Sequence, residues 1–217
     1  MRCAYHSLKF WPALLVFALL ATGWLQAGWA AAPKLAEKPE PRADKLKFKD
    51  QSGKTAFSLK LKDDGAKLVD GDEKELARYT RSGNKLKIKD PADKVLAYVV
   101  IADEKLRLES ADQQTELYSL RKQAEGGWKL EDPTGTRLYT IKPRDYGAEV
   151  EEAAKNSLYK AKVTGSKSSL RDAKDKTVFH TDQAVSAVAM SCLGLDKIAD
   201  VRLRVALLFA LDPCAKK

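Results

Sequence analysis

The sequence predicts a mainly β domain that ends in a hydrophobic α-helix. Apolar and polar residues alternate in short runs from Lys45 onward, and turn-forming residues separate these runs. An almost continuous apolar stretch then follows Asp182. Alternation with a period of two is typical of strands that have one buried face. A helix that is hydrophobic nearly all round is buried in protein or embedded in a membrane.

The strand pattern is clearest where lysine alternates with a large apolar residue. The apolar positions of three such runs are Leu46 and Phe48, Leu59 and Leu61, and Leu86 and Ile88. Clusters of Asp, Gly, Asn and Ser predict turns at 50–53, 63–65, 70–72, 82–84, 90–93, 125–127 and 132–135. Gly and Asn adopt the positive φ that tight hairpins need, and Asp bonds its own backbone.

A weak internal repeat accompanies these strands. Similar segments begin at Leu46, Leu86, Leu106 and Trp128, and a looser copy begins at Lys67. Each has an apolar-x-apolar run, a turn and a second apolar run. The starting points are about 20 residues apart, which corresponds to one β-hairpin per unit.

The C-terminal stretch predicts one buried helix over 184–211. Arg202 and Arg204 lie inside it, so the uninterrupted apolar part after them is too short to span a bilayer, which needs ~20 residues. Pro213 prevents further helix.

Residues 1–30 have the composition of a secretory signal peptide. Arg2 and Lys9 precede an apolar run, and the small residues Gly28 and Ala30 predict cleavage before Ala31. An uncleaved membrane anchor is the alternative. In either case we expect an exported protein of the periplasm, the cell envelope or the extracellular space.

The next segment, 31–44, contains three prolines among Lys, Glu and Ala, and it shows no periodicity. This composition predicts a flexible linker. The folded domain is therefore expected to occupy 45–217, a length that suits a single domain.

The segment Asp200–Asp212, DVRLRVALLFALD, resembles the C-terminal helix of phospholipid scramblases. Together with the repeated hairpins, it is similar to the tubby-like superfamily, which includes scramblases and LURP-one-related plant proteins. The resemblance covers about 45–213. It implies an antiparallel β-barrel of about a dozen hairpin-connected strands around a central hydrophobic C-terminal α-helix.

This chain departs from the scramblase pattern in several places. The acidic calcium-binding segment before the helix is missing, and Asp182 stands there nearly alone. The cysteine-rich palmitoylation cluster is missing as well. Once the signal is removed, Cys192 and Cys214 remain. They form either a disulfide or two separate thiols, and the length of the helix between them favours the thiols.

The sequence offers little catalytic chemistry. His180 is the single histidine after the signal segment, so no Ser-His-carboxylate arrangement can be assembled. Structural zinc takes four ligands, which these residues do not supply. Asp70, Asp72 and Glu73 fall short of a calcium-loop pattern. We therefore expect a non-enzymatic protein without metal or cofactor.

The net charge of +9 and the lysines of the alternating runs suggest an anionic partner. These lysines should face outward because their apolar neighbours face inward. They are the candidate ligand-binding residues: Lys47, Lys49, Lys60, Lys62, Lys85, Lys87 and Lys89.

We expect a monomer that binds anionic phospholipid headgroups or an envelope polymer. Nucleic acid is disfavoured because few outward aromatic residues accompany the lysines. The alternative is a structural or protein-interaction module with no small ligand, in which the lysines only protect strand edges.

Overall fold

The computed structural model describes residues 44–212. The predicted signal segment, almost all of the predicted linker and Cys214 lie outside the described residues. The expected cleavage, the linker and the pairing of Cys192 with Cys214 therefore stay predictions.

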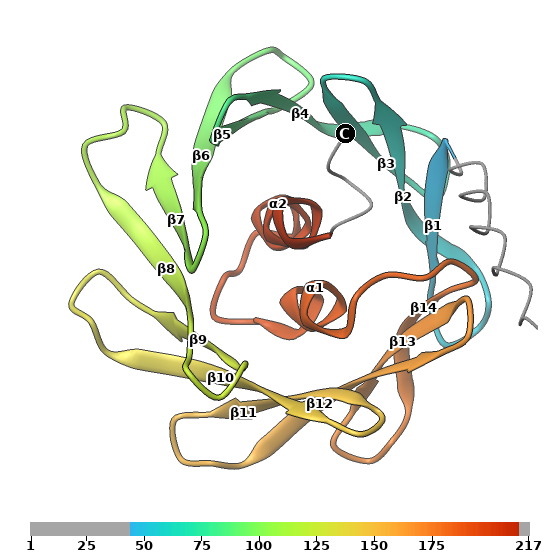
Figure 1. Cartoon of the computed structure of the whole chain (residues 1–217). Helices are drawn as coiled ribbons and strands as arrows, with labels where there is room; N and C mark the ends of the chain where they lie inside the picture. The colour runs from blue at the N-terminus through green and yellow to red at the C-terminus, as the bar shows by residue number, and fades with distance from the viewer. Residues whose placement is uncertain (1–43, 213–217) are drawn as a thin grey trace, which may run out of the picture. The chain divides into compact units, whose positions relative to one another are not determined.

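Fourteen strands form a closed antiparallel barrel (Figure 1). Each strand pairs with the next one along the chain, and β1 pairs with β14, with Lys49 opposite His180. The strands are β1 (Lys45–Lys49), β2 (Thr55–Lys62), β3 (Gly65–Asp70), β4 (Glu75–Ser82), β5 (Lys85–Lys89), β6 (Val95–Ala102), β7 (Lys105–Ser110), β8 (Glu116–Lys122), β9 (Trp128–Glu131), β10 (Arg137–Arg144), β11 (Gly147–Glu152), β12 (Ser157–Thr164), β13 (Lys167–Asp172) and β14 (Thr177–Thr181). The mainly β antiparallel barrel is confirmed, and the contact of β1 with β14 closes it.

One turn type produces the repeat of about 20 residues seen in the sequence. In the first copy, Asp50 Oδ1 accepts the backbone N–H groups of Ser52 and Lys54 at 2.8 and 3.1 Å, and Gly53 has a φ of 81°. Equivalent residues with positive φ are Gly53, Glu73, Asp93, Gln113, Gly135, Lys155 and Asp175. A register shift interrupts the strand pairing beside each of these turns. We call them the long turns, and they lie at one end of the barrel.

Alternate residues of the strands fill the barrel interior. Leu59, Leu68, Leu86 and Ile88 are each fully buried, and the lysines between them face outward, as their spacing predicts. Burying each such leucine or isoleucine contributes about 1.5–3 kcal/mol.

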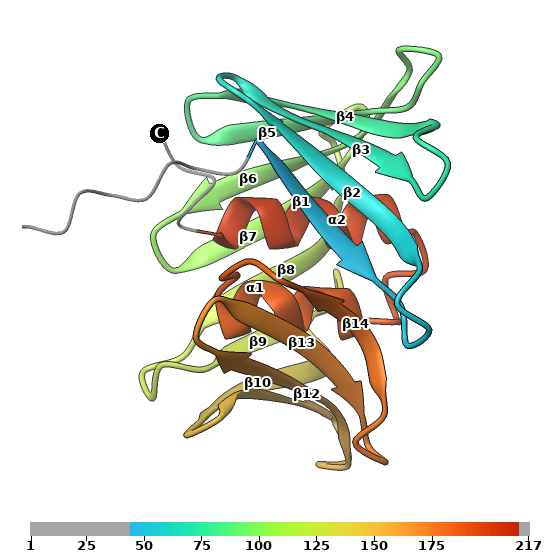
Figure 2. The same ribbon diagram turned by 90° about the vertical axis from the view of Figure 1, so that its right-hand side faces the viewer.

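The interior also holds two short helices, and the prediction of one helix over 184–211 is wrong (Figures 1 and 2). Helix α1 (Ala187–Ser191) continues into a 3₁₀ turn, η1 (Cys192–Gly194), and α2 (Val201–Leu211) follows separately. Asp200 starts the second helix because its side chain accepts the N–H of Arg202 at 2.9 Å. Helix α1 packs against β10–β13, whereas α2 packs against β4–β6.

Four inward-facing tyrosines of the barrel wall form hydrogen bonds with the segment between the two helices and with the first turn of α2. The Tyr79 hydroxyl donates to the Arg202 carbonyl at 2.9 Å, and the Tyr118 hydroxyl donates to the Lys197 carbonyl at 3.0 Å. Tyr139 Oη accepts the N–H of Lys197 at 3.2 Å, and the Tyr159 hydroxyl donates to Asp196 at 2.5 Å. The tyrosines provide partners for polar groups that enter the barrel.

Arg204 completes this network. Its Nη1 donates to the Leu193 carbonyl and to Asp196 Oδ1, both at 2.8 Å. The arginine that interrupts the apolar stretch thus joins α2 to the segment that follows α1. None of the described helices is both long enough and apolar enough to cross a membrane.

Candidate functional site

Strand register places five basic residues in one row across the outer face of β1–β5. Lys45 lies opposite Lys60, Lys60 opposite Lys67, Lys67 opposite Arg78, and Arg78 opposite Lys89. Like charges directly opposite each other destabilise a sheet unless counter-charges separate them.

Carboxylates provide that separation. Glu73 bridges Lys45 and Lys60, with 2.5 Å to Lys60 Nζ. Hydrogen bonds from these two lysines lower the pKa of Glu73 to about 2. Glu75 and Asp93 neutralise the remaining members of the row in the same way, at 2.5–3.0 Å. Every member of the row is therefore ion-paired, with five cations sharing three carboxylates.

The seven predicted lysines divide into two groups. Lys49, Lys60 and Lys89 are in ion pairs with Asp182, Glu73 and Asp93, at 2.8, 2.5 and 3.0 Å. In the part of the chain that the structure describes, no carboxylate lies within 4.0 Å of the ammonium groups of the remaining four. We call these the unpaired lysines: Lys47, Lys62, Lys85 and Lys87.

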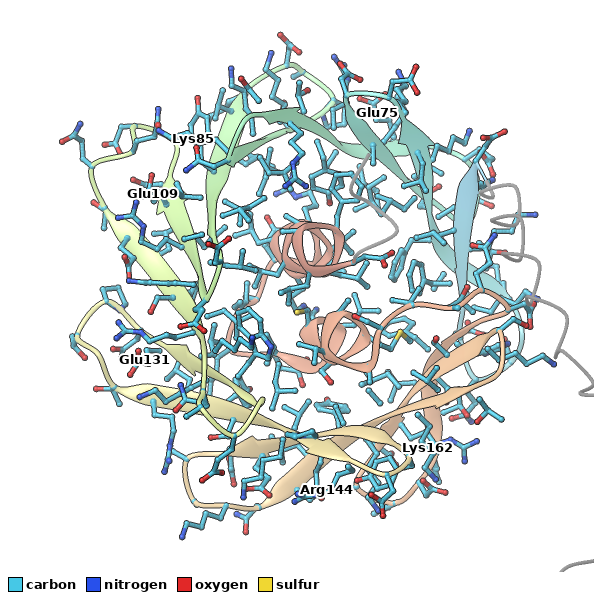
Figure 3. The ribbon with its side chains drawn as sticks, viewed as in Figure 1. Glu75, Lys85, Glu109, Glu131, Arg144 and Lys162 are labelled. Carbon is cyan, nitrogen blue, oxygen red and sulfur yellow. The ribbon has the colours of Figure 1, made fainter. Side chains whose placement is uncertain are left out.

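Two of the unpaired lysines line a hollow of about 290 Å³ on the outer face of β4–β6. Lys85 donates to Gln113 Oε1 at 2.7 Å, and Lys87 Nζ lies 5.9 Å from the centre of the Tyr98 ring. Among residues 44–212, its lining is Thr80, Ser82, Lys85, Lys87, Tyr98 and Gln113, which includes no carboxylate. Figure 3 shows Lys85 projecting from the outer surface. We call this site the Lys85–Lys87 hollow.

Lys62 lies in the same cross-strand row as Lys87. The register runs from Lys62 through Gly65 and Thr80 to Lys87, over four adjacent strands. At ~4.8 Å per strand, the two lysine backbones lie about 14 Å apart. Gly65 is required there because a Cβ would approach the Tyr79 carbonyl oxygen to 1.9 Å.

Charge is distributed unevenly around the barrel. The eight consecutive strands β12–β14 and β1–β5, with their turns (157–182 and 44–94), carry twenty Lys and Arg against thirteen Asp and Glu. The remaining wall, 95–156, carries nine against twelve. We call these the basic arc and the acidic arc. All seven predicted lysines lie on the basic arc.

A second hollow, of about 360 Å³, lies on the basic arc over β12–β14. Lys162, Lys167, Arg171 and His180 line it together with Ser and Thr hydroxyls, while Asp175 pairs with Lys162 and Arg171 at 2.9 and 3.2 Å. The sequence reasoning missed this hollow because the pattern of lysine alternating with Leu or Ile is absent from these strands. The only available signal was the density of Lys and Arg over 160–176.

Groups suited to catalysis are scattered. Cys192 is fully buried, and burial raises the pKa of its thiol. Among residues 44–212, no three His, Cys, Asp or Glu side chains are grouped so that they could hold a metal ion.

The fold and this outer face define a closed antiparallel β-barrel with helices in its interior and a one-sided positive charge. No protein-family model and no curated protein matches the sequence. A solved X-ray structure of a protein from Arabidopsis thaliana is similar, with a TM-score of 0.40 and 10% identity over 75% of this chain and 97% of that chain. The tubby-like relationship indicated by 200–212 remains a hypothesis.

Proposed function

We propose that this protein is a non-enzymatic, exported barrel that binds an anionic surface, such as phospholipid headgroups, through its basic arc. The observation that carries the proposal is the carboxylate-free Lys85–Lys87 hollow on the basic arc. An ammonium group without a protein counter-ion gains most from an anionic partner, because no existing ion pair has to be broken first. Each lysine near an anionic membrane contributes about 1 kcal/mol.

Vesicle sedimentation tests the proposal. Phosphatidylcholine vesicles with and without phosphatidylglycerol are compared for the unmodified protein and for the variant Lys47→Gln/Lys62→Gln/Lys85→Gln/Lys87→Gln. We expect weak binding to the anionic vesicles only, and a loss of up to about 10³-fold in the variant at low salt. Raising salt from ~0.1 M to ~1 M should abolish binding, because the screening length falls from ~10 to ~3 Å.

The matched control removes the same charge from the acidic arc, at Lys105, Lys122, Lys129 and Lys155. It should lower binding far less than the basic-arc variant. Equal losses would show that net charge alone matters. Absence of binding by the unmodified protein at low salt would contradict the proposal.

The second candidate function is a structural or protein-interaction module without a small ligand. The ion-pair network formed by Glu73, Glu75 and Asp93 favours it, because these carboxylates already satisfy most of the basic row. Such a module would sediment with neither type of vesicle.

We also propose that the domain belongs to the tubby-like superfamily and that 1–30 directs export. An apolar C-terminal helix inside an antiparallel barrel, with the sequence of 200–212, supports the first part. The order of Arg2, an apolar run and small residues supports the second. N-terminal sequencing of the exported protein should begin at Ala31, and an intact Met1 on a membrane-bound species would indicate an anchor.

A further inference from the structure

An arginine faces the interior of the barrel at the end opposite the long turns. In β4, Ala77 and Tyr79 are buried with 0% and 2% of their surface exposed, and Arg81 continues the same inward-facing series. Its Nη1 is buried and has no hydrogen-bond partner among the described residues. Buried donors are almost always satisfied, so an unsatisfied guanidinium nitrogen calls for an explanation.

The guanidinium lines a cavity of about 440 Å³, the largest of the hollows described here. Its lining residues come from the β4–β5 and β6–β7 turns, from the barrel wall and from the C-terminal end of α2. The apolar part of the lining is Ile101, Ala102, Leu106, Trp128, Ala210 and Leu211. The polar part is Arg81, Gly83, Asn84 and Asp103. A cavity of ~300–1,000 Å³ in which a few convergent polar groups accompany apolar side chains is typical of a small-molecule site.

Two features limit how much negative charge this cavity accepts. The carboxyl-terminal end of α2, at Ala210 and Leu211, carries the negative end of the helix dipole. Asp103, on the neighbouring turn, adds a negative charge to the lining. A ligand with two negative charges would be repelled, whereas one carboxylate can form charge-assisted hydrogen bonds with Arg81.

We propose that this cavity binds an amphipathic monocarboxylate. Its carboxylate accepts hydrogen bonds from Arg81, and its apolar tail lies against Ile101, Leu106 and Trp128. The site goes beyond the proposed function, because it lies at the end of the barrel, between the β4–β5 and β6–β7 turns, and uses none of the lysines of the basic arc.

Trp128 makes the proposal measurable. The chain has four tryptophans, and replacing Trp11, Trp24 and Trp29 by Phe in the full chain leaves Trp128 as the only indole fluorophore. Titration with decanoate should change its emission and saturate. Decanol, decyl phosphate and decyltrimethylammonium have the same tail with a different head group. We expect each to bind at least about tenfold more weakly, because each loses the charge-assisted pair or adds repulsion.

The decisive variant is Arg81→Gln, with Arg78→Gln as its control. Arg78 lies on the same strand but faces outward, where it pairs with Glu75 and Asp93. We expect Arg81→Gln to weaken decanoate binding at least about tenfold and Arg78→Gln to leave it unchanged. If Arg81→Gln does not fold, Ile101→Phe fills the apolar side of the cavity and should abolish saturation.

Unchanged decanoate binding in Arg81→Gln, or equally tight binding of decanol, would overturn the proposal. A lack of saturable binding by the unsubstituted cavity would overturn it as well. The variant lacking the four unpaired lysines should bind decanoate normally. A negative result in the vesicle experiment would therefore not change the interpretation of the decanoate titration.

Discussion

Replacing Arg204 by Met tests whether the polar network around Asp196 holds the two helices inside the barrel. The side chain of Arg204 is 17% exposed, and its Nη1 makes two hydrogen bonds of 2.8 Å, to the Leu193 carbonyl and to Asp196. Asp196 also accepts the Tyr159 hydroxyl at 2.5 Å. The substitution removes both hydrogen bonds of Arg204. Methionine replaces the apolar part of the arginine side chain.

The expected cost follows from the burial of the partners. A hydrogen bond to a charged group contributes about 1.5–3 kcal/mol, and a buried acceptor left unsatisfied costs about 1–3 kcal/mol. Leu193 is only 2% exposed, whereas the Asp196 side chain is 51% exposed and can turn to water. The loss at Leu193 therefore dominates, and we expect the free energy of unfolding to fall by about 2–3 kcal/mol.

Urea unfolding followed by far-ultraviolet circular dichroism measures this difference. Arg202→Met is the matched control, because the Arg202 guanidinium pairs with Asp200 two residues away and should contribute below about 1 kcal/mol. Tyr159→Phe should cost about 1 kcal/mol. The double variant with Arg204→Met should deviate from additivity by at least about 0.5 kcal/mol, because both side chains contact Asp196. Equal effects of the two arginine substitutions, or strict additivity, would refute the network.

Two further predictions concern the interior. Leu207 is 1% exposed, so Leu207→Asp places an unpaired charge in the core and should unfold the domain, whereas near-normal thermal melting would mean that α2 is exposed. Burial first, and the hydrogen bond to Asp196 second, raise the pKa of Tyr159 to about 12, and burial also raises the pKa of Tyr79. Because both folded-state pKa values exceed the ordinary value of about 10, the stability from the neutral hydroxyls is complete below pH 10, and the contribution of Tyr159 is lost as pH rises through about 12. Alkaline unfolding should therefore coincide with a late step in tyrosinate absorbance that Tyr159→Phe diminishes, and the appearance of that step without unfolding would contradict the assignment.

Sequence reasoning could predict the strands because one physical rule governs them. Wherever lysine alternates with Leu, Ile or Phe, burial of the apolar face fixes which side chains point inward. The turns were harder to predict from the sequence, because five of the long turns have a residue other than glycine at positive φ. The turns at Lys155 and Asp175, which contain no glycine, were not predicted, although the turn at 90–93 was predicted without one. The ring closes because β1, the first strand, pairs with β14, the last strand. The periodicity of a strand does not indicate which distant strand it pairs with.

The single-helix prediction failed for a related reason. In the sequence, Asp196 and Asp200 are two polar positions in an apolar stretch. Taken alone, they do not exclude a continuous helix. In the structure Asp196 lies between the helices, where it accepts the hydroxyl of Tyr159 from β12, and Asp200 caps α2. Tyr159 is almost 40 residues away from Asp196 in the sequence. Long-range polar contacts of this kind override local helix propensity.

The candidate site shows the same division between local and long-range information. The outward direction of the lysines follows from their own strands, but their electrostatic state depends on other hairpins. Glu73 reaches Lys45 and Lys60 from the β3–β4 turn, so an ion pair forms between hairpins that the sequence separates. Only the closed ring shows which lysines are paired and which have no ion pair with another of the residues 44–212.

The two arginines of β4 show how strand periodicity alone divides the molecule into two separate recognition surfaces. Arg78 and Arg81 are three residues apart, and an odd separation in a strand places side chains on opposite faces. Arg78 therefore joins the ion-pair network outside, while Arg81 enters the interior without a hydrogen-bond partner for its Nη1. A polyanionic surface cannot reach Arg81 through the wall, and a small carboxylate outside meets only paired or solvated cations. The outer face and the inner cavity should therefore respond independently to salt, because only binding to the outer face relies on charges that are screened by the solvent.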